Sequence, residues 1–556
     1  MKKTAVLAAA LLTLSLSGCK KTEKSDNTPP EPTSAVQEET QPETDAPTED
    51  KTEPATEKTD SLYPDYPITY PEIIPHDTGD LYEAEDAKLS SGLKTAGEPA
   101  QDGEDGEVFS GEGYVTGFPD SGGSVTFDIK APSTQHYDLA FSISADTETE
   151  CKVLVNGREF SSFTTMDDGE FTLITLYGAF LTKGQSAIVI DVTEPSGDIK
   201  LDYLRLANTT TLSRLSYDTE DSPVNENAGE SAKKLLSFMT ESYGRYILSG
   251  QYVSDSTQSP GDEIELIHET TGKYPVIRFC ALTGDVETKT LDACAEWYKN
   301  GGIPGLMWYW NAPGEKPSVY AEETDFRLAD AYTELDIAGK TQEEIRGLYS
   351  SGQITKECYG LILGMDDMAG QLTILRNKGV PVLWRPLHEA AGDWFWWGAD
   401  GADAYIWLWE LMYKRYTEFF GLDNLIWVWS GQSDTVLVDK DTFDIAALDI
   451  YLDSSRDFGS RFEQFAALQG IVGGDKLVAL SECSSIPDID ASFRDNAVWS
   501  FFGLWYGKYL ENDGKLSEEY MKKDYLIHCY NSDGVLTLDE YEILRNGGKL
   551  EPEYEQ

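Results

Sequence analysis

The chain has 556 residues, with 44 basic and 98 acidic side chains and a formal net charge of −54. This length suggests about three structural units, and a charge this negative excludes nucleic-acid phosphates and anionic lipid headgroups as electrostatic partners. A hydrophobic content of 40% is enough for packed cores, so the whole chain is not disordered. The seven cysteines contain no Cys-x-x-Cys pair, which argues against a zinc ribbon or a dense disulfide framework.

The first 19 residues have the pattern of an export signal. A basic start precedes an apolar run over residues 4–16, which is shorter than the roughly 20 apolar residues that span a bilayer. The run ends in Leu-Ser-Gly-Cys at 16–19, which resembles the bacterial lipobox and implies that Cys19 is diacylated and becomes the mature N-terminus. Two acyl chains would hold the protein on the extracellular face of the cell membrane. A plain secretory signal with an incidental cysteine is the alternative.

Residues 20–78 form an acidic segment rich in Thr, Pro and Glu, with almost no apolar side chain before Leu62. Such a composition cannot bury enough apolar surface to offset its chain entropy, so we expect a disordered linker. A spacer of this kind indicates that the following domains work at a distance from the membrane, on something bulky.

Residues 79–208 have the pattern of an all-β module. Apolar and polar residues alternate in four runs: Ser124–Ile129, Tyr137–Ser144, Lys152–Val155 and Ala187–Val192. This is the period of half-buried strands, and the Asn156-Gly157 pair is a strong hairpin signal. The pattern predicts a jelly-roll-like β-sandwich.

Four stretches of this module, at 82–85, 110–115, 155–157 and 201–204, resemble carbohydrate-binding module family 35. The resemblance implies a structural calcium held by Glu83, Glu85 and Asp202, whose hard oxygen atoms suit that ion. The module contains no tryptophan, so any sugar site must use tyrosine, phenylalanine or polar loop residues.

Eight apolar, β-branched or aromatic runs then follow in order. They are Arg245–Ser249, Tyr274–Phe279, Gly305–Trp310, Val380–Arg385, Asn424–Ser430, Phe443–Tyr451, Lys476–Ser481 and Val498–Trp505. Helical candidates separate them, among them Glu230–Glu241, Leu291–Asn300, Lys356–Lys378 and Asp403–Phe420. This alternation predicts an α/β domain, a (β/α)8 TIM barrel over residues 225–550, in a multidomain chain. A doubly wound open sheet is the main alternative, but no Gly-x-Gly-x-x-Gly follows an early strand.

Two glutamates stand at the carboxyl ends of predicted strands, where barrel enzymes do their chemistry: Glu389 after the fourth strand and Glu482 after the seventh. Glycoside hydrolysis needs such a pair, and carboxyl groups about 5–5.5 Å apart favour retention whereas about 6.5–9.5 Å favours inversion. Two close negative charges also raise one pKa, which keeps that carboxyl protonated. Four aromatic residues at 394–397 offer a wall for sugar rings.

The sequence Trp-Arg-Pro-Leu-His-Glu at 384–389, with Trp-Phe-Trp-Trp-Gly at 394–398, resembles glycoside hydrolase family 26, whose best-known members are endo-β-1,4-mannanases. Asp-Ile-Tyr at 449–451, Ser-Gly-Gln at 249–251 and Trp-Tyr-Trp-Asn-Ala-Pro at 308–313 fit the same family. The resemblance implies a retaining double displacement, with Glu389 as general acid/base, Glu482 as nucleophile and no catalytic cofactor.

The same resemblance implies contacts around the reacting sugar. Tyr451 would hydrogen-bond the nucleophile, and four residues would contact substrate: His388, Trp394, Trp505 and Trp310. Tyr309 stands where many relatives have a histidine, which leaves the contacts at that point and the choice of sugar open.

The leading hypothesis is a surface-anchored, monomeric endo-β-mannanase whose β-sandwich module binds the polymer. One alternative keeps the catalytic machinery but changes the substrate to mixed-linkage β-glucan or xylan. Another is a lipoprotein that captures glycans without cleaving them, which the two intact carboxylates disfavour.

Overall fold

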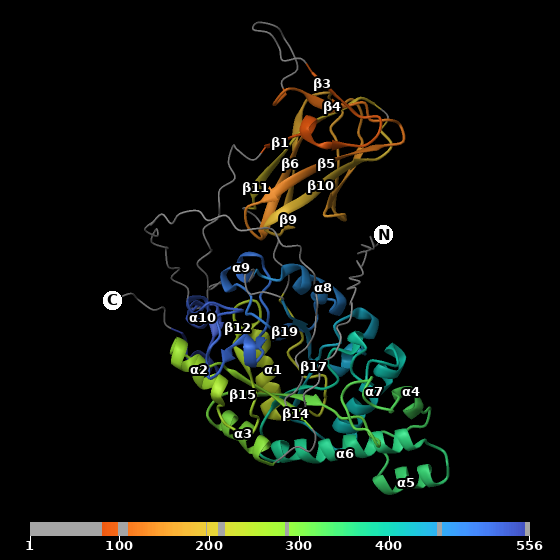
Figure 1. The fold of residues 1–556 in the computed structure, drawn as a ribbon, viewed down its shortest axis with the longest axis vertical. Helices are drawn as coiled ribbons and strands as arrows, with labels where there is room; N and C mark the ends of the chain where they lie inside the picture. Colours follow the sequence, from red (N-terminus) through yellow and green to blue (C-terminus); the bar gives the residue numbers. More distant parts are fainter. Residues whose placement is uncertain are drawn as a thin grey trace. The chain divides into compact units, whose positions relative to one another are not determined.

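The computed structural model describes residues 81–97, 109–195, 197–209, 217–283, 288–452 and 459–550. They form two compact units, a β-sandwich followed by an α/β barrel (Figure 1). The predicted signal peptide with Cys19 and the predicted linker over residues 20–78 lie outside the described residues. In the described part, no helix combines the length and the apolar character needed to cross a membrane.

The first unit consists of two antiparallel sheets. Its strands are β1 (Leu81–Glu83), β2 (Lys88–Leu89), β3 (Lys94–Ala96), β4 (Tyr114–Thr116), β5 (Gly123–Ala131), β6 (Gln135–Ala145), β7 (Glu150–Val155), β8 (Arg158–Thr164), β9 (Thr172–Leu181), β10 (Gly184–Val192) and β11 (Ile199–Asn208). One sheet has the order β3-β4-β11-β6-β9, with β1 also paired to β11, and the other has the order β2-β5-β10-β7-β8.

Apolar side chains from both sheets make one core. In β5, Val125, Phe127 and Ile129 are at most 2% exposed, and the Phe127 ring lies 6.4 Å from the Phe141 ring of β6. The hairpin between β7 and β8 turns at Asn156 and Gly157, with φ angles of 49° and 81°, as a type I′ turn requires. The predicted β-sandwich is therefore confirmed.

The second unit is a closed, eight-stranded parallel barrel. Its strands are β13 (Gly250–Val253), β14 (Ile277–Thr283), β15 (Ile303–Tyr309), β16 (Val382–Arg385), β17 (Leu425–Trp429), β18 (Ile445–Ile450), β19 (Leu477–Cys483) and β20 (Phe502–Leu504). They follow one another around the barrel in chain order, and β20 closes it by pairing with β13. The predicted TIM barrel is confirmed, and the open sheet is excluded.

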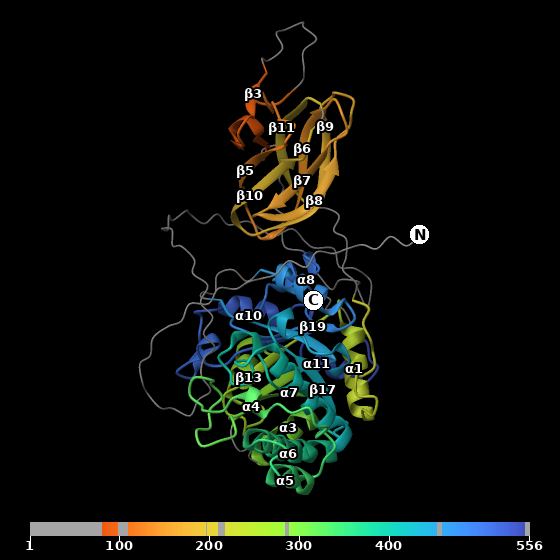
Figure 2. The same ribbon diagram turned by 90° about the vertical axis from the view of Figure 1, so that its right-hand side faces the viewer.

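Helices cover the outside of the barrel. They are α1 (Glu230–Ser242), α2 (Asp262–Thr271), α3 (Thr288–Lys299), α4 (Leu328–Ala331), α5 (Gln342–Ser350), α6 (Lys356–Asn377), α7 (Ala402–Lys414), α8 (Phe462–Val472), α9 (Ile489–Arg494), α10 (Lys523–Tyr530) and α11 (Leu538–Arg545). For example, α3 and α6 lie side by side on the outer surface in both views (Figures 1 and 2).

The first barrel strand lies later in the sequence than predicted. Within the expected strand over residues 245–249, Ile247–Leu248 form the short strand β12, which pairs with β23 (Val535–Leu536) outside the barrel. The barrel strand itself begins at Gly250, where a Cβ would come within 2.5 Å of the Phe502 carbonyl and 2.6 Å of the Phe279 ring. The glycine therefore permits the close approach of β20 that closes the barrel. A further two-stranded pair, β21 (Glu511–Asn512) and β22 (Lys515–Leu516), follows β20.

Candidate active site

Glu389 reaches the barrel mouth through a strained turn after β16. Leu387 and Glu389 both have a φ of 51°, in the left-handed region that side chains other than glycine rarely adopt. The Glu389 amide donates a hydrogen bond of 2.8 Å to the Ser430 carbonyl at the end of β17, which fixes this turn. Such strain at a buried carboxylate, which is 6% exposed, is typical of a functional site.

Glu482 lies on β19, beside Asp449 of β18. The register between these strands shifts after Leu448, so that Asp449 pairs with Glu482. This irregularity turns both carboxylates toward the same space, because an extra residue re-aims the side chains that follow it. Glu482 is 1% exposed, and the Asp449 side chain is fully buried.

A buried arginine joins the two carboxylates. Arg385, the last residue of β16, donates from Nη1 to Glu482 Oε1 at 2.5 Å and from Nη2 to Asp449. Tyr451 donates to the other Glu482 oxygen at 2.6 Å, and Ser481 donates to Asp449 at 2.7 Å. Glu482 thus accepts one hydrogen bond at each of its two oxygens.

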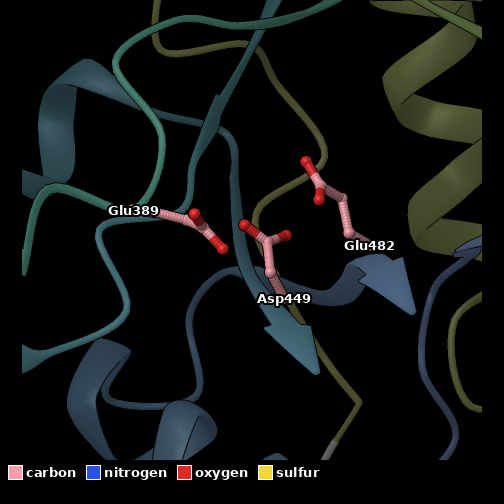
Figure 3. A group of neighbouring side chains, drawn as sticks. All are labelled: Glu389, Asp449 and Glu482. Atoms are coloured by element: carbon pink, nitrogen blue, oxygen red, sulfur yellow. The ribbon is translucent and has the colours of Figure 1, made fainter. Parts of the chain in front are cut away.

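Glu389 completes a group of three carboxylates. One oxygen atom each from Glu389, Asp449 and Glu482 lies within 4.8 Å of the other two, and the side chains converge from the turn after β16 and from strands β18 and β19 (Figure 3). Three carboxylates this close are a set that can hold a cation, but Arg385 already supplies a positive charge to two of them. The protein itself therefore provides the charge that a metal ion would bring.

The surroundings of Glu389 favour its protonated form. Burial, followed by the negative charge of Glu482, raises the pKa of Glu389 to about 8, against the opposing effects of Arg385 and a hydrogen bond from Trp394. Near neutral pH, Glu389 therefore carries a proton. The mouth therefore contains one carboxyl that can donate a proton, beside Glu482, whose two oxygens both accept hydrogen bonds.

Aromatic side chains line the mouth beside Glu389. Trp394 is half-buried and donates from Nε1 to Glu389 Oε2 at 3.2 Å. A Cβ on Gly392 would come within 2.0 Å of the Trp394 ring, so only glycine leaves room for this indole position. The buried His388 ring lies 4.7 Å from the Phe395 ring. Burial and the Arg385 charge hold the pKa of His388 well below its usual range, so its imidazole is neutral.

Four of the five predicted contact residues lie near the carboxylates, and one does not. Tyr451, Trp394 and His388 are described above, and Trp505 lies 4.6 Å from the Tyr252 ring, whose hydroxyl accepts a hydrogen bond from Arg385. Trp310 instead stacks on Trp308 at 4.2 Å and packs against Gly364 of α6. Its indole therefore lies between the barrel and a covering helix.

Three residues of the site were not among those predicted: Arg385, Asp449 and Gln432. Gln432, at a φ of 72°, exchanges two hydrogen bonds of 3.2 Å with the Asp449 backbone. Arg385 and Asp449 both belong to motifs quoted above, and both are charged residues at the end of apolar strands. That position was the available signal, since a charge is rarely buried there without a partner.

The predicted calcium ligands are linked through residues 110–113 of the sandwich, although their oxygen atoms do not all lie within 4.8 Å of one another. Ser110 links two of them, donating from its amide to Asp202 at 2.9 Å and from its hydroxyl to Glu83 at 2.6 Å. The Glu112 and Gly113 amides donate to Glu85. The second oxygen atoms of Glu83 and Glu85 are buried without a hydrogen-bond partner in the described part of the chain. Unsatisfied carboxylate oxygens fit a hard cation such as calcium.

The chain resembles known proteins over most of its length. The family model described as glycosyl hydrolase family 26 matches residues 224–540. A mannan endo-1,4-beta-mannosidase of Thermothelomyces thermophilus is 32% identical over 493 residues, which cover 85% of this chain and 92% of that protein. Mannan endo-1,4-beta-mannosidase A of Piromyces sp. is 30% identical, over 83% of this chain and 72% of that protein.

A solved structure shows the same likeness. The crystal structure of a Podospora anserina GH26-CBM35 beta-(1,4)-mannanase matches with a TM-score of 0.57 and 31% identity, covering 84% of this chain and 99% of that one. Residues 217–550 alone could not supply so large a share, so the match extends into the sandwich. On this evidence the chain belongs to glycosyl hydrolase family 26 and is a glycoside hydrolase.

Proposed function

We propose that this protein is a retaining endo-β-1,4-mannanase in which Glu389 is the general acid/base and Glu482 the nucleophile. The observation that carries the proposal is the short approach of the two carboxylates, since one oxygen atom of Glu389 lies within 4.8 Å of one oxygen atom of Glu482. An inverting enzyme needs roughly 6.5–9.5 Å to admit a water molecule between substrate and base, whereas a retaining enzyme needs about 5–5.5 Å.

In the first step, a Glu482 oxygen would attack the anomeric carbon while Glu389 gives its proton to the departing glycosidic oxygen. Arg385 and Tyr451 orient the attacking carboxylate, because each donates to one of its oxygens. The C–O bond to the leaving sugar breaks as the glycosyl ester with Glu482 forms.

The second step would use Glu389 and Glu482 again, with Glu482 now esterified and Glu389 now a carboxylate. Esterification removes the negative charge of Glu482, which is one cause of the raised pKa of Glu389. The pKa of Glu389 should therefore fall once the ester forms, and the resulting carboxylate can take a proton from water. Water then attacks the anomeric carbon and releases Glu482.

Mannan is the substrate favoured over β-glucan and xylan. The relatives that cover most of the chain are named as mannan endo-1,4-beta-mannosidases. The Trp394 ring beside Glu389 offers a surface for a sugar face next to the bond that is cleaved.

The proposal extends to the architecture of the whole protein. Cys19 would carry a lipid anchor on the extracellular face of the cell membrane, and residues 20–78 would space a monomeric enzyme from it. The sandwich would bind polysaccharide and so raise its concentration near the barrel. A calcium ion held by Glu83, Glu85 and Asp202 would stabilise the sandwich, as the buried unsatisfied oxygens of both glutamates suggest.

The anomeric configuration of the first product tests the mechanism. Proton NMR of manno-oligosaccharide cleavage should show the β-anomer before mutarotation, and an α-anomer would contradict retention. Glu482→Ala with added azide should release an α-mannosyl azide, because the small anion replaces the missing nucleophile. The same preparation tested on mannan, mixed-linkage glucan and xylan settles the substrate by which polymer yields oligosaccharides.

Fractionation of producing cells tests the location. The wild-type protein should sediment with membranes, and Cys19→Ala should shift it to the medium. Membrane association that survives the substitution would contradict the lipid anchor.

A further inference from the structure

Tyr309 is the last residue of β15 and faces the interior of the barrel. Side chains alternate along a strand, and two earlier residues on the same side of β15 face inward: Gly305 lies against the Phe279 ring, and Met307 Sδ lies 2.9 Å from Arg385 Nη1. Tyr309 continues this row to the mouth, where its ring meets His388 edge-on at 5.1 Å.

The Tyr309 side chain is buried and held in one place by other rings. It is 5% exposed, and the Phe395 ring packs against it at 5.9 Å in addition to His388. A side chain fixed in this way is a preorganised group, because little further freedom is lost when a ligand meets it.

The charges of Glu389 and Glu482 both act on the Tyr309 hydroxyl, but neither carboxylate is hydrogen-bonded to it. Burial and the charges of Glu482 and Glu389 raise its pKa well above the usual value, so the phenol remains a neutral O–H donor. It makes no hydrogen bond to any residue that the structure describes. Two other phenols of the mouth differ from it, because Tyr451 donates to Glu482 and Tyr252 accepts from Arg385.

The carboxylates do not need the Tyr309 hydroxyl. Both oxygens of Glu482 already accept hydrogen bonds from Arg385 and Tyr451, and Glu389 accepts one from Trp394. The Tyr309 hydroxyl is not among the fully buried polar atoms of the described residues, so it is accessible from the mouth and can bond to a ligand there. In a site that cleaves sugars, the available partners are the hydroxyl groups of the bound ring.

We propose that Tyr309 is a specificity-determining residue whose hydroxyl bonds to one hydroxyl group of the sugar held between Glu389 and Glu482. The inference rests on the proposed function and deepens it. A site built to bond a substrate hydroxyl discriminates against the analogue that lacks it, because the buried group is then left unpaired.

Tyr309→Phe tests this assignment, since it removes one oxygen and keeps the ring. With manno-oligosaccharides, kcat/KM should fall about tenfold, the effect of one lost hydrogen bond, while Tm stays the same. Tyr349→Phe is the matched control, because Tyr349 is 39% exposed on α5 and should leave kcat/KM unchanged.

Substrates that lack single hydroxyl groups on the reacting sugar identify the contact. The wild type should lose activity on each deoxy substrate, and for one of them Tyr309→Phe should cause no further loss, because both partners of the same bond are already absent. Unchanged kcat/KM in Tyr309→Phe, or additive losses with every deoxy substrate, would overturn the proposal. A wild type inactive on all mannosides would instead overturn the proposed function.

Discussion

The protein gathers carboxylates in two places, and the two groups differ in how their charge is balanced. The barrel mouth contains Glu389, Asp449 and Glu482, and the sandwich contains Glu83, Glu85 and Asp202. Arg385 lies among the first group and bonds to two of its members. Around the second group, the described residues place no basic side chain in an ion pair, and the pKa of Glu83 is raised by burial and by the neighbouring acids Glu85 and Asp202.

Among the described residues, the presence of an arginine in one group and its absence from the other suit the two groups of carboxylates to different roles. In the mouth the protein supplies its own cation, so the remaining imbalance falls on Glu389, which keeps a proton. In the sandwich the balance is incomplete, and two buried oxygens have no partner in the part of the chain that is described. The first arrangement suits acid/base and nucleophilic catalysis, and the second suits a site filled by an external ion.

Removing Glu482, the proposed nucleophile, should have the largest effect of any change in the mouth. Glu482→Ala should lower kcat on mannan by about 10⁴-fold or more, because no glycosyl ester can form. Initial-rate measurements of reducing sugar release provide the value. Glu343→Gln, at an exposed site on α5, should leave kcat unchanged. If Glu482→Ala kept activity within tenfold of the wild type, the mouth would not be the catalytic centre.

Replacing the proton donor should have a smaller and substrate-dependent effect. Glu389→Gln should lower kcat/KM on mannan by about 10³-fold, but much less on an aryl mannoside whose leaving group needs no proton. The wild-type kcat/KM should fall as pH rises through about 8, because the pKa of Glu389 is raised to about 8 and the acid form is lost above it. The variant should lack this basic limb. Equal losses on both substrates would count against the role of Glu389.

Arg385→Met should lower the stability of the protein, because it removes the positive charge that Asp449 and Glu482 share. Two buried carboxylates would lose their partner, and breaking such a pair costs about 3–5 kcal/mol in the free energy of unfolding. Denaturant unfolding measures this loss, with the exposed Arg346→Met as the control at less than about 0.5 kcal/mol.

Adding Asp449→Asn and Glu482→Gln to Arg385→Met should restore part of the lost stability, because neutral amides need no counter-ion. If the triple variant were as unstable as Arg385→Met alone, packing rather than charge would explain the loss.

The meeting of Glu389 and Glu482 at the barrel mouth was predictable because their position follows from topology. Parallel strands bring their carboxyl ends to one rim, so glutamates directly after the fourth and seventh strands had to share the mouth. The place of Asp449 beside Glu482 depends on the shift in strand register after Leu448. The alternation of apolar and polar residues in the sequence does not predict this shift. The first barrel strand was predicted to end before Gly250, because glycine is uncommon inside strands. In the structure this strand begins at Gly250, since the close contact with β20 leaves no room for a side chain there.

The position of Trp310 could have been predicted from the alternation of side chains along β15, but the many tryptophans around it suggested a substrate contact instead. Its place in a tryptophan-rich motif suggested a substrate contact. The alternation along β15, however, puts residues 306, 308 and 310 on the side opposite Met307 and Tyr309. The indole accordingly faces α6 and contacts Gly364. Strand period was the better guide at this position.

The smallest predicted effect concerns the sandwich group, which should respond to calcium. Chelation should lower the Tm of the sandwich transition by about 10 °C, since a ligand at 100 times its Kd contributes about 2.7 kcal/mol. Differential scanning calorimetry of the full chain, with and without calcium, measures the shift. Magnesium should not replace calcium, because it requires shorter bonds and stricter geometry.

Two variants of the sandwich distinguish a bound ion from general electrostatics. Glu85→Gln should abolish most of the calcium response, whereas Asp128→Asn should keep it, because Asp128 is exposed and paired with Lys88. In the chelated protein, mild acid should raise the transition, because the raised pKa values of Glu83 and Asp202 mean that folding favours their protonated forms. Calcium should remove this gain, since it takes the place of the protons. If neither calcium nor Glu85→Gln changed the Tm of the sandwich, these carboxylates would not bind an ion. The two carboxylate groups would then differ only in how deeply they are buried.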